Sequence, residues 1–216
     1  MTIGRLASRL ALGTAVTALV TAGLGAPAAL AHGKSKPLGT RSLAAVLTAD
    51  TSGFDRNGRD FDVLTAAVLA VLDAKPASSV KVLTDGTVAL TAFVPTDAAF
   101  QKLAREVTKS RRLPSERSAF TTVAGLGIDT VEAVLLYHVV PGATIDRRAA
   151  LRFDNARLTT AAGSKIKVDV RHWYRVTLVD ADRNDRNPAV VKFDINKGNK
   201  QIAHAVDRVL RPVDLP

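Results

Sequence analysis

Side chains that could carry out nucleophilic or acid–base chemistry are scarce in this sequence. It has no cysteine, and its four histidines, His32, His138, His172 and His204, are scattered along the chain. A serine hydrolase of the common type needs a Gly-x-Ser-x-Gly elbow, and many zinc enzymes carry two closely spaced histidines, as in His-x-x-x-His. Neither pattern occurs. The sequence therefore predicts a protein that is not an enzyme and that needs no cofactor.

One acidic run resembles the opening of a calcium-binding loop. Residues 180–185 read Asp-Ala-Asp-Arg-Asn-Asp, which fits the alternating oxygen ligands of such a loop. Position six should then be glycine and position twelve glutamate, but Asp185 and Val191 stand there. The neighbouring Arg183 and Arg186 would also repel a cation. We interpret the run as a solvated turn between strands, and the sequence predicts no metal site.

Basic residues could bind a polyanion. The chain of 216 residues has a formal net charge of +10, and an electropositive surface attracts negatively charged polymers. Residues 108–119 are interpreted as an inserted basic loop, and a second basic segment follows later. The candidate polyanion-binding residues are Lys109, Arg111, Arg112 and Arg117, and the second segment carries Arg147, Arg148, Arg152 and Arg157. No aromatic residues alternate with these charges, so nucleic acid is not the expected partner. The alternative is a surface that only keeps the protein soluble.

Two histidines lie within apolar sequence. His138 is flanked by Leu136 and Val139, and His204 lies between Ile202 and Val206. A buried imidazole needs hydrogen-bond partners, so both are interpreted mainly as core residues, with Thr96 or Asp97 as the expected partners. The alternative is that they belong to a binding site.

The element that must position these residues is the decapeptide of residues 91–100, TAFVPTDAAF. Its first four residues are apolar or β-branched and predict a short buried strand. Pro95 cannot donate to a strand ladder and so ends it. Thr96 and Asp97 offer side-chain oxygens as caps for a helix that begins there.

This decapeptide resembles the first signature of the fasciclin domain family. Two further segments resemble the later signatures in the expected order: LLYHVVPG, which holds a Tyr-His pair, and IAHAVDRVLRP at residues 202–212. The matching positions are Thr96, Asp97, Tyr137, His138, His204 and Asp207. The resemblance implies a single domain at residues 42–212 with a β-sandwich-like sheet and helices packed along one side. In animal members the Tyr-His region is associated with receptor binding, but here the six residues are interpreted as mainly structural.

The remaining pattern agrees with an α+β fold, because helical periodicity dominates early and period-two alternation late. Ser42 is expected to cap a short helix, and residues 61–72 to form a longer one. Residues 83–94 predict a hairpin around Asp85-Gly86. Residues 129–132 read as a capping box for a helix over 131–138. Strands are expected over 166–170, 174–178, 190–193 and 202–210.

The N-terminus predicts export. Arg5 and Arg9 precede an apolar run, and residues 29–31 form an Ala-x-Ala cleavage site, which together are typical of a signal peptide over residues 1–31. Residues 32–41 are expected to be a flexible mature N-terminus. An uncleaved transmembrane anchor is the alternative. After cleavage the product should be secreted, extracellular or associated with the cell surface, and should not span a membrane.

These observations predict a secreted, non-enzymatic adhesion or surface-interaction module. Its partner would be an extracellular protein, or an anionic glycan or cell-wall polymer. The alternative function is an extracellular carrier of an apolar small molecule, such as a pigment or a lipid. The sequence indicates no oligomeric state.

Overall fold

The computed structural model describes residues 36–214. The predicted signal peptide, residues 1–31, and residues 32–35 of the predicted flexible segment lie outside the described residues. The chain is hydrogen-bonded into the domain from Gly39 on: Gly39 pairs with Asn199, and the backbone N–H of Arg41 donates to the side chain of Asn199 at 3.0 Å.

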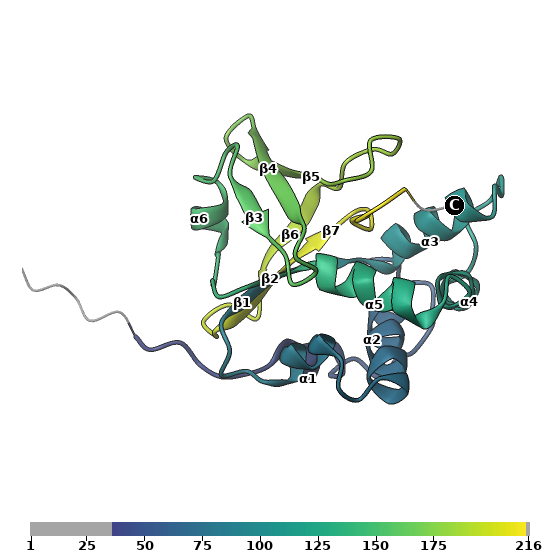
Figure 1. Ribbon diagram of the computed structural model, residues 1–216, viewed down its shortest axis with the longest axis horizontal. Coiled ribbons are helices and arrows are strands. Elements are labelled where there is room, and N and C mark those ends of the chain that lie inside the picture. Colours follow the sequence, from purple (N-terminus) through teal and green to yellow (C-terminus); the bar gives the residue numbers. More distant parts are fainter. Residues whose placement is uncertain (1–35, 215–216) are drawn as a thin grey trace, which may run out of the picture. The chain divides into compact units, whose positions relative to one another are not determined.

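Helices dominate the first half of the domain and strands the second half (Figure 1). The helices are α1 (Leu43–Leu47), α2 (Asp62–Ala74), the 3-10 helix η1 (Ser79–Thr84), α3 (Asp97–Val107), α4 (Glu116–Ala124), α5 (Ile128–Tyr137) and α6 (Arg147–Ala150). The strands are β1 (Leu90–Pro95), β2 (Val139–Pro141), β3 (Arg157–Thr159), β4 (Lys165–Arg171), β5 (Arg175–Val179), β6 (Val190–Ile195) and β7 (Gln201–Val206).

The strands form two sheets. A four-stranded sheet has the order β2-β1-β7-β6, and a three-stranded antiparallel sheet has the order β3-β4-β5. In the larger sheet β1 and β7 are parallel, with Thr91 opposite Ile202 and Phe93 opposite His204. The first and last family-like motifs are therefore neighbouring strands.

The larger sheet lies between the helices and the smaller sheet. Every residue of β1 and of β7 is buried, as expected for central strands covered on both faces. Along β1, Ala92 and Val94 belong to the core shared with the helices, whereas Phe93 belongs to a second core with Ile166 and Val176 of the smaller sheet. The predicted α+β architecture, a β-sandwich-like arrangement with helices on one side, is confirmed.

The predicted hairpin at residues 83–94 is wrong. Residues 79–84 form η1, and only residues 90–95 form a strand. Asp85-Gly86 still turns the chain, but Gly86 is required for another reason. A Cβ at Gly86 would lie 1.8 Å from the backbone oxygen of Thr40, so only glycine permits this close approach.

Two further boundaries differ from the sequence expectation. Helix α5 begins directly after Gly127, which has φ +89°. Asp129 therefore lies inside the helix and does not cap it. The carboxylates of Asp129 and Glu132 instead contact Lys75. Residues 108–119 are not one inserted loop, because Ser115 caps α4 and its side chain accepts a hydrogen bond from Ser118 N.

Within residues 36–214, no single helix has the length and apolar composition needed to cross a membrane. Helices α4 and α5 pass that test only when taken together, and they are bent by 108° relative to each other.

Candidate functional site

The motif at the start of α3 caps two helices. The Thr96 side chain accepts a hydrogen bond from Ala99 N at 3.3 Å, which confirms the predicted cap of α3. The Asp97 carboxylate instead reaches the start of α2 and accepts from Asp62 N at 3.0 Å and from Val63 N at 2.8 Å. These two N–H groups would otherwise lack a partner at the helix terminus. One dipeptide therefore fixes the angle between α2 and α3.

Both core histidines are hydrogen-bonded to the backbone, so the predicted network with Thr96 or Asp97 is not formed. The Nε2 atom of His138 accepts from Leu210 N at 2.9 Å, and its Nδ1 atom lies 2.7 Å from the carbonyl oxygen of Val134. The amide donor requires Nε2 to be unprotonated, so Nδ1 carries the proton. Burial lowers the pKa of His138 to about 4, and the imidazole is neutral at pH 7.

His204 has the same kind of environment on β7. Its Nδ1 atom accepts from Asp194 N at 3.1 Å, and its Nε2 atom lies 2.8 Å from the carbonyl oxygen of Ile145. Its ring also packs against those of Phe93 and Phe193. Burial lowers its pKa. Each histidine thus ties separate segments of backbone together.

The remaining motif residues also join elements. The Tyr137 hydroxyl donates to the Lys165 carbonyl oxygen at 3.3 Å, and burial raises its pKa to about 12. The Asp207 carboxylate accepts from Ala189 N at 2.7 Å, while Lys102 Nζ donates to the backbone oxygen of Asp207 at 2.9 Å. All six motif side chains are thus partnered to backbone groups in ways that stabilise the fold.

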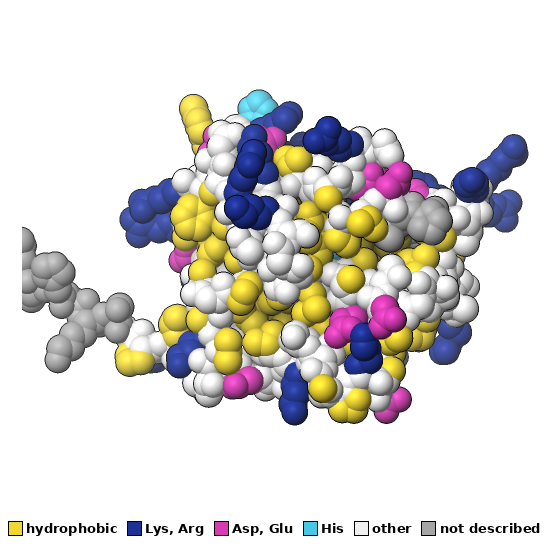
Figure 2. Space-filling model, viewed as in Figure 1, with side chains coloured by type: hydrophobic (Ala, Val, Ile, Leu, Met, Phe, Trp, Pro, Cys, Tyr) yellow, Lys and Arg dark blue, Asp and Glu magenta, His cyan; other side chains and the backbone are white. Residues whose placement is uncertain are grey.

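Two open hollows flank the start of β6. The first, called here the arginine hollow, has a volume of about 410 Å³ and includes Arg171, Arg175 and Arg186 in its lining. The second has a volume of about 460 Å³, and its lining includes Arg59, Lys102, Lys192, Thr96 and Asp207. Ala189 lines the first hollow and Val191 lines the second, so the two hollows lie on either side of one short segment. Figure 2 shows Lys and Arg side chains gathered at the top of the view, over the strands that Figure 1 labels β4 and β5.

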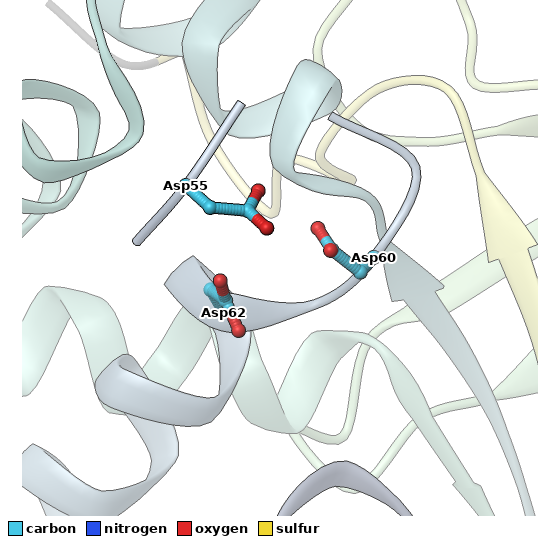
Figure 3. A group of neighbouring side chains, drawn as sticks. All are labelled: Asp55, Asp60 and Asp62. Carbon is cyan, nitrogen blue, oxygen red and sulfur yellow. The ribbon is translucent and has the colours of Figure 1, made fainter. Parts of the chain in front are cut away.

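An acid cluster surrounds the starts of α2, α3 and α4. Carboxylate oxygens of Asp55, Asp60 and Asp62 all lie within 4.8 Å of one another, as do those of Asp60, Asp97 and Glu116. Figure 3 shows Asp55 and Asp60 pointing toward one another, beside Asp62 at the first turn of α2. Burial raises the pKa of Asp97 to about 8, with Asp60 adding to the rise, and also raises the pKa values of Asp62 and Glu116.

Comparison with known proteins decides the family. A model of the fasciclin domain matches residues 65–212. The chain belongs to the fasciclin domain family. A solved structure with a similar fold is a pair of FAS1 domains from the insect cell adhesion molecule fasciclin I, with a TM-score of 0.54 and 16% identity. The match covers 80% of this chain and 51% of that one, so the chain spans about half of the domain pair. A comparison with curated protein sequences finds no match.

The predicted polyanion-binding residues of this fasciclin domain are divided between a loop and a helix. Lys109, Arg111 and Arg112 are exposed after α3, and Arg117 lies on α4 with its guanidinium carbon 5.1 Å from the ring centre of Phe54. Only the first three therefore share a loop.

The run at residues 180–185 of the fasciclin domain is not a simple solvated turn. Asp182 is buried and its carboxylate lies 3.1 Å from Arg211 Nη1, while the Asp185 carboxylate lies 2.9 Å from Arg208 Nη1. Glu106 of α3 contacts both arginines. The acids that suggested a calcium loop instead tie the β5–β6 connection to the C-terminal segment.

Three cavities lined by apolar side chains, among the helices and beside β1, have volumes of about 10, 20 and 80 Å³. Sites for small organic ligands usually have volumes of roughly 300–1,000 Å³. These three cavities are therefore too small for a pigment or a lipid. The second hollow, at about 460 Å³, lies within that range, and its lining includes Ala98, Val191 and Ala205.

Sequence reasoning missed the arginine hollow and the acid cluster. The hollow joins the β4–β5 turn to the β5–β6 connection. The cluster joins segments up to 61 residues apart, since Asp55 N donates to Glu116 at 2.7 Å. A local signal existed for the cluster alone: Asp55, Asn57, Asp60 and Asp62 bring oxygen-bearing side chains close together in sequence.

Proposed function

We propose that this fasciclin domain is a non-enzymatic extracellular surface-interaction module, and that it binds an anionic glycan or cell-wall polymer at the arginine hollow. The observation that carries the proposal is the pair Arg175 and Arg186. Both are exposed at a concave surface, and neither lies within 4.0 Å of a carboxylate in the described residues.

The charge balance of the hollow favours an anionic ligand. Its two acids already have partners: Asp169 pairs with Arg171 at 2.8 Å, and Asp185 pairs with Arg208 at 2.9 Å. The charges of Arg175 and Arg186 therefore remain available to a ligand. Guanidinium groups bind carboxylate, sulfate and phosphate oxygens in a two-pronged geometry, which suits the acidic groups of such polymers.

Exposed aromatic side chains adjoin the hollow. Trp173, the only tryptophan in the chain, is 92% exposed, and Tyr174 is 64% exposed; both lie in the turn between β4 and β5. His172 and Trp173 have positive φ values, 50° and 62°, because they are the two central residues of the hairpin turn that Tyr174 N closes onto the Arg171 carbonyl oxygen at 3.4 Å. Aromatic residues and arginine are enriched where proteins bind partners. Trp173 and Tyr174 lie in the chain between His172 and Arg175, which line the hollow, so this turn offers aromatic surface to a polymer that extends beyond it.

Two further considerations support binding without turnover. The polar residues of the three family motifs are engaged in backbone hydrogen bonds, as described above. The signal-peptide pattern at residues 1–31 supports an extracellular location, where such polymers would be accessible to the module.

The test is retention on immobilised heparin and on immobilised teichoic acid, eluted with a salt gradient. The variant Arg175→Ser/Arg186→Ser should elute at clearly lower salt than wild type. Salt screens exposed charges beyond about 8 Å at physiological ionic strength, so retention depends mainly on the basic groups that lie close to the bound polymer. The matched control is Arg111→Ser/Arg112→Ser, which removes the same charge from the exposed loop after α3. Equal elution of both double variants would mean that net charge alone causes retention, and the proposed site would then be wrong.

A further inference from the structure

The acid cluster consists of Asp55, Asp60, Asp62, Asp97 and Glu116. These five side chains come from three separate segments, namely the loop before α2 with its first turn, the start of α3 and the start of α4. In the described residues none of them lies within 4.0 Å of a lysine, arginine or histidine nitrogen. The cluster therefore gathers five carboxyl groups without a basic partner, and the raised pKa values of Asp97, Asp62 and Glu116 reflect the cost of their charged forms when no cation is bound.

Among residues 36–214, several oxygens of the cluster are buried with no hydrogen-bond donor. Glu116 is 1% exposed, and although its Oε2 accepts from Asp55 N, its Oε1 has no hydrogen-bond donor. Asp62 is 8% exposed, and its buried Oδ2 has no donor either. The Oδ1 atom of Asp60 is in the same situation. Buried carboxylate oxygens without donors are destabilising when charged, and either a bound proton or a bound cation relieves that cost.

We propose that the acid cluster binds a hard divalent cation, and that this cation is Ca²⁺. The two carboxylate triads share Asp60, so one ion near Asp60 can draw ligands from both. All candidate ligands are oxygens, with no imidazole or thiolate among them, which excludes the ligand sets preferred by zinc and copper.

The loop before α2 suits calcium better than magnesium. Calcium accepts six to eight oxygens in irregular geometry, whereas magnesium requires a nearly regular octahedron and retains several waters. Five of the ten carboxylate oxygens in the cluster accept hydrogen bonds from N–H groups, which leaves five others for an ion at this irregular site. Extracellular calcium modules typically have dissociation constants of about 10⁻⁴–10⁻³ M, and a partly exposed site such as this one fits that range.

Binding would lock three helix starts together. Asp97 already caps α2 through Asp62 N and Val63 N, and Glu116 is the first residue of α4. An ion held between them would fix α2, α3 and α4 relative to one another. The inference is independent of the arginine hollow, which lies on the smaller sheet and the β5–β6 connection.

The test uses the exported protein, dialysed against EDTA and titrated calorimetrically with CaCl₂ and, separately, with MgCl₂. We expect saturable calcium binding, weaker magnesium binding, and a melting temperature that rises with calcium concentration, because a ligand specific for the folded state stabilises it. The variants Asp62→Asn and Glu116→Gln should each lose at least about ten-fold in calcium affinity, as expected when a ligand charge is removed. The control is Asp73→Asn on the same helix α2, where the side chain is exposed and outside the cluster.

The effect of each substitution on the melting temperature should change sign between calcium-free and calcium-saturated protein. Without calcium, Asp62→Asn and Glu116→Gln should melt higher than wild type, because they relieve repulsion among buried carboxylates. With saturating calcium they should melt lower than wild type. Absence of a saturable signal in wild type, or equal affinity in wild type and both variants, would overturn the proposal. Tighter binding of magnesium than of calcium would overturn the choice of ion.

Discussion

Removing the titratable group of His138 should flatten the acid dependence of stability. In the native protein Nε2 must stay unprotonated to accept from Leu210 N, and burial lowers the pKa of His138 to about 4. In the unfolded chain its pKa should be near 6.5. Above pH 6.5 the imidazole is neutral in both states. Between pH 6.5 and 4 only the unfolded chain takes up the proton, so acidification favours unfolding.

The expected magnitude follows from that difference in pKa. A shift of about 2.5 units corresponds to about 3 kcal/mol of unfolding free energy, present above pH 6.5 and lost as the pH approaches 4. This is a large share of a total stability of roughly 5–15 kcal/mol. Urea denaturation at several pH values from 7.5 to 4.5, compared between wild type and His138→Gln, isolates the contribution of this one residue.

Other groups titrate in the same range, and the comparison removes their effects. Burial raises the pKa of Asp180 to about 6, which makes stability rise on acidification, but wild type and variant share this group. The variant should be less stable than wild type at pH 7.5, and the gap should narrow steadily toward pH 4.5. Parallel profiles with a constant gap would refute the assignment of His138 as a neutral, buried hydrogen-bond acceptor.

The remaining predictions concern the motif residues and the N-terminus. Thr96→Ala removes a helix cap and should lower the free energy of unfolding by about 0.5–2 kcal/mol. His204→Ala leaves Asp194 N without its acceptor and should lower it by about 1–3 kcal/mol. In thermal melts both variants should unfold at a lower temperature than wild type. Polymer binding by either variant should fall only as far as the folded fraction falls, and a variant that melts like wild type but loses binding would place its residue in a functional site. N-terminal sequencing of exported protein should start at or near His32, whereas Met1 on membrane-bound material would contradict cleavage.

The sequence predicted most where a feature is local. The strand, stop and cap at residues 91–100 depend only on neighbouring residues, and the structure places Thr96 as expected. The parallel register of β1 and β7 could be anticipated only through the family resemblance, since these strands are far apart in the chain. Asp97 shows the limit of local reasoning. It lies where its own helix needs a cap, yet it caps a helix whose first residues lie 35 and 34 positions earlier.

Features assembled from distant segments could not be predicted. The acid cluster requires Glu116 to approach Asp55 and Asp60, which happens only when α4 packs beside α2. Arg211 neutralises Asp182 from 29 residues away, so a run that looked like a solvated turn is partly buried. The arginine hollow likewise depends on how the β4–β5 turn meets the β5–β6 connection.

The most direct test of the proposed function is a fluorescence titration of the protein with soluble heparin or teichoic acid. Trp173 is the only tryptophan, and it is exposed in the turn that contributes His172 and Arg175 to the arginine hollow, so we expect its emission to respond to a ligand bound there. We expect a saturable change in emission that salt reverses, that Arg175→Ser/Arg186→Ser abolishes, and that Arg111→Ser/Arg112→Ser leaves in place. Unchanged emission while the polymer still binds the protein in a parallel sedimentation assay would contradict binding at this surface.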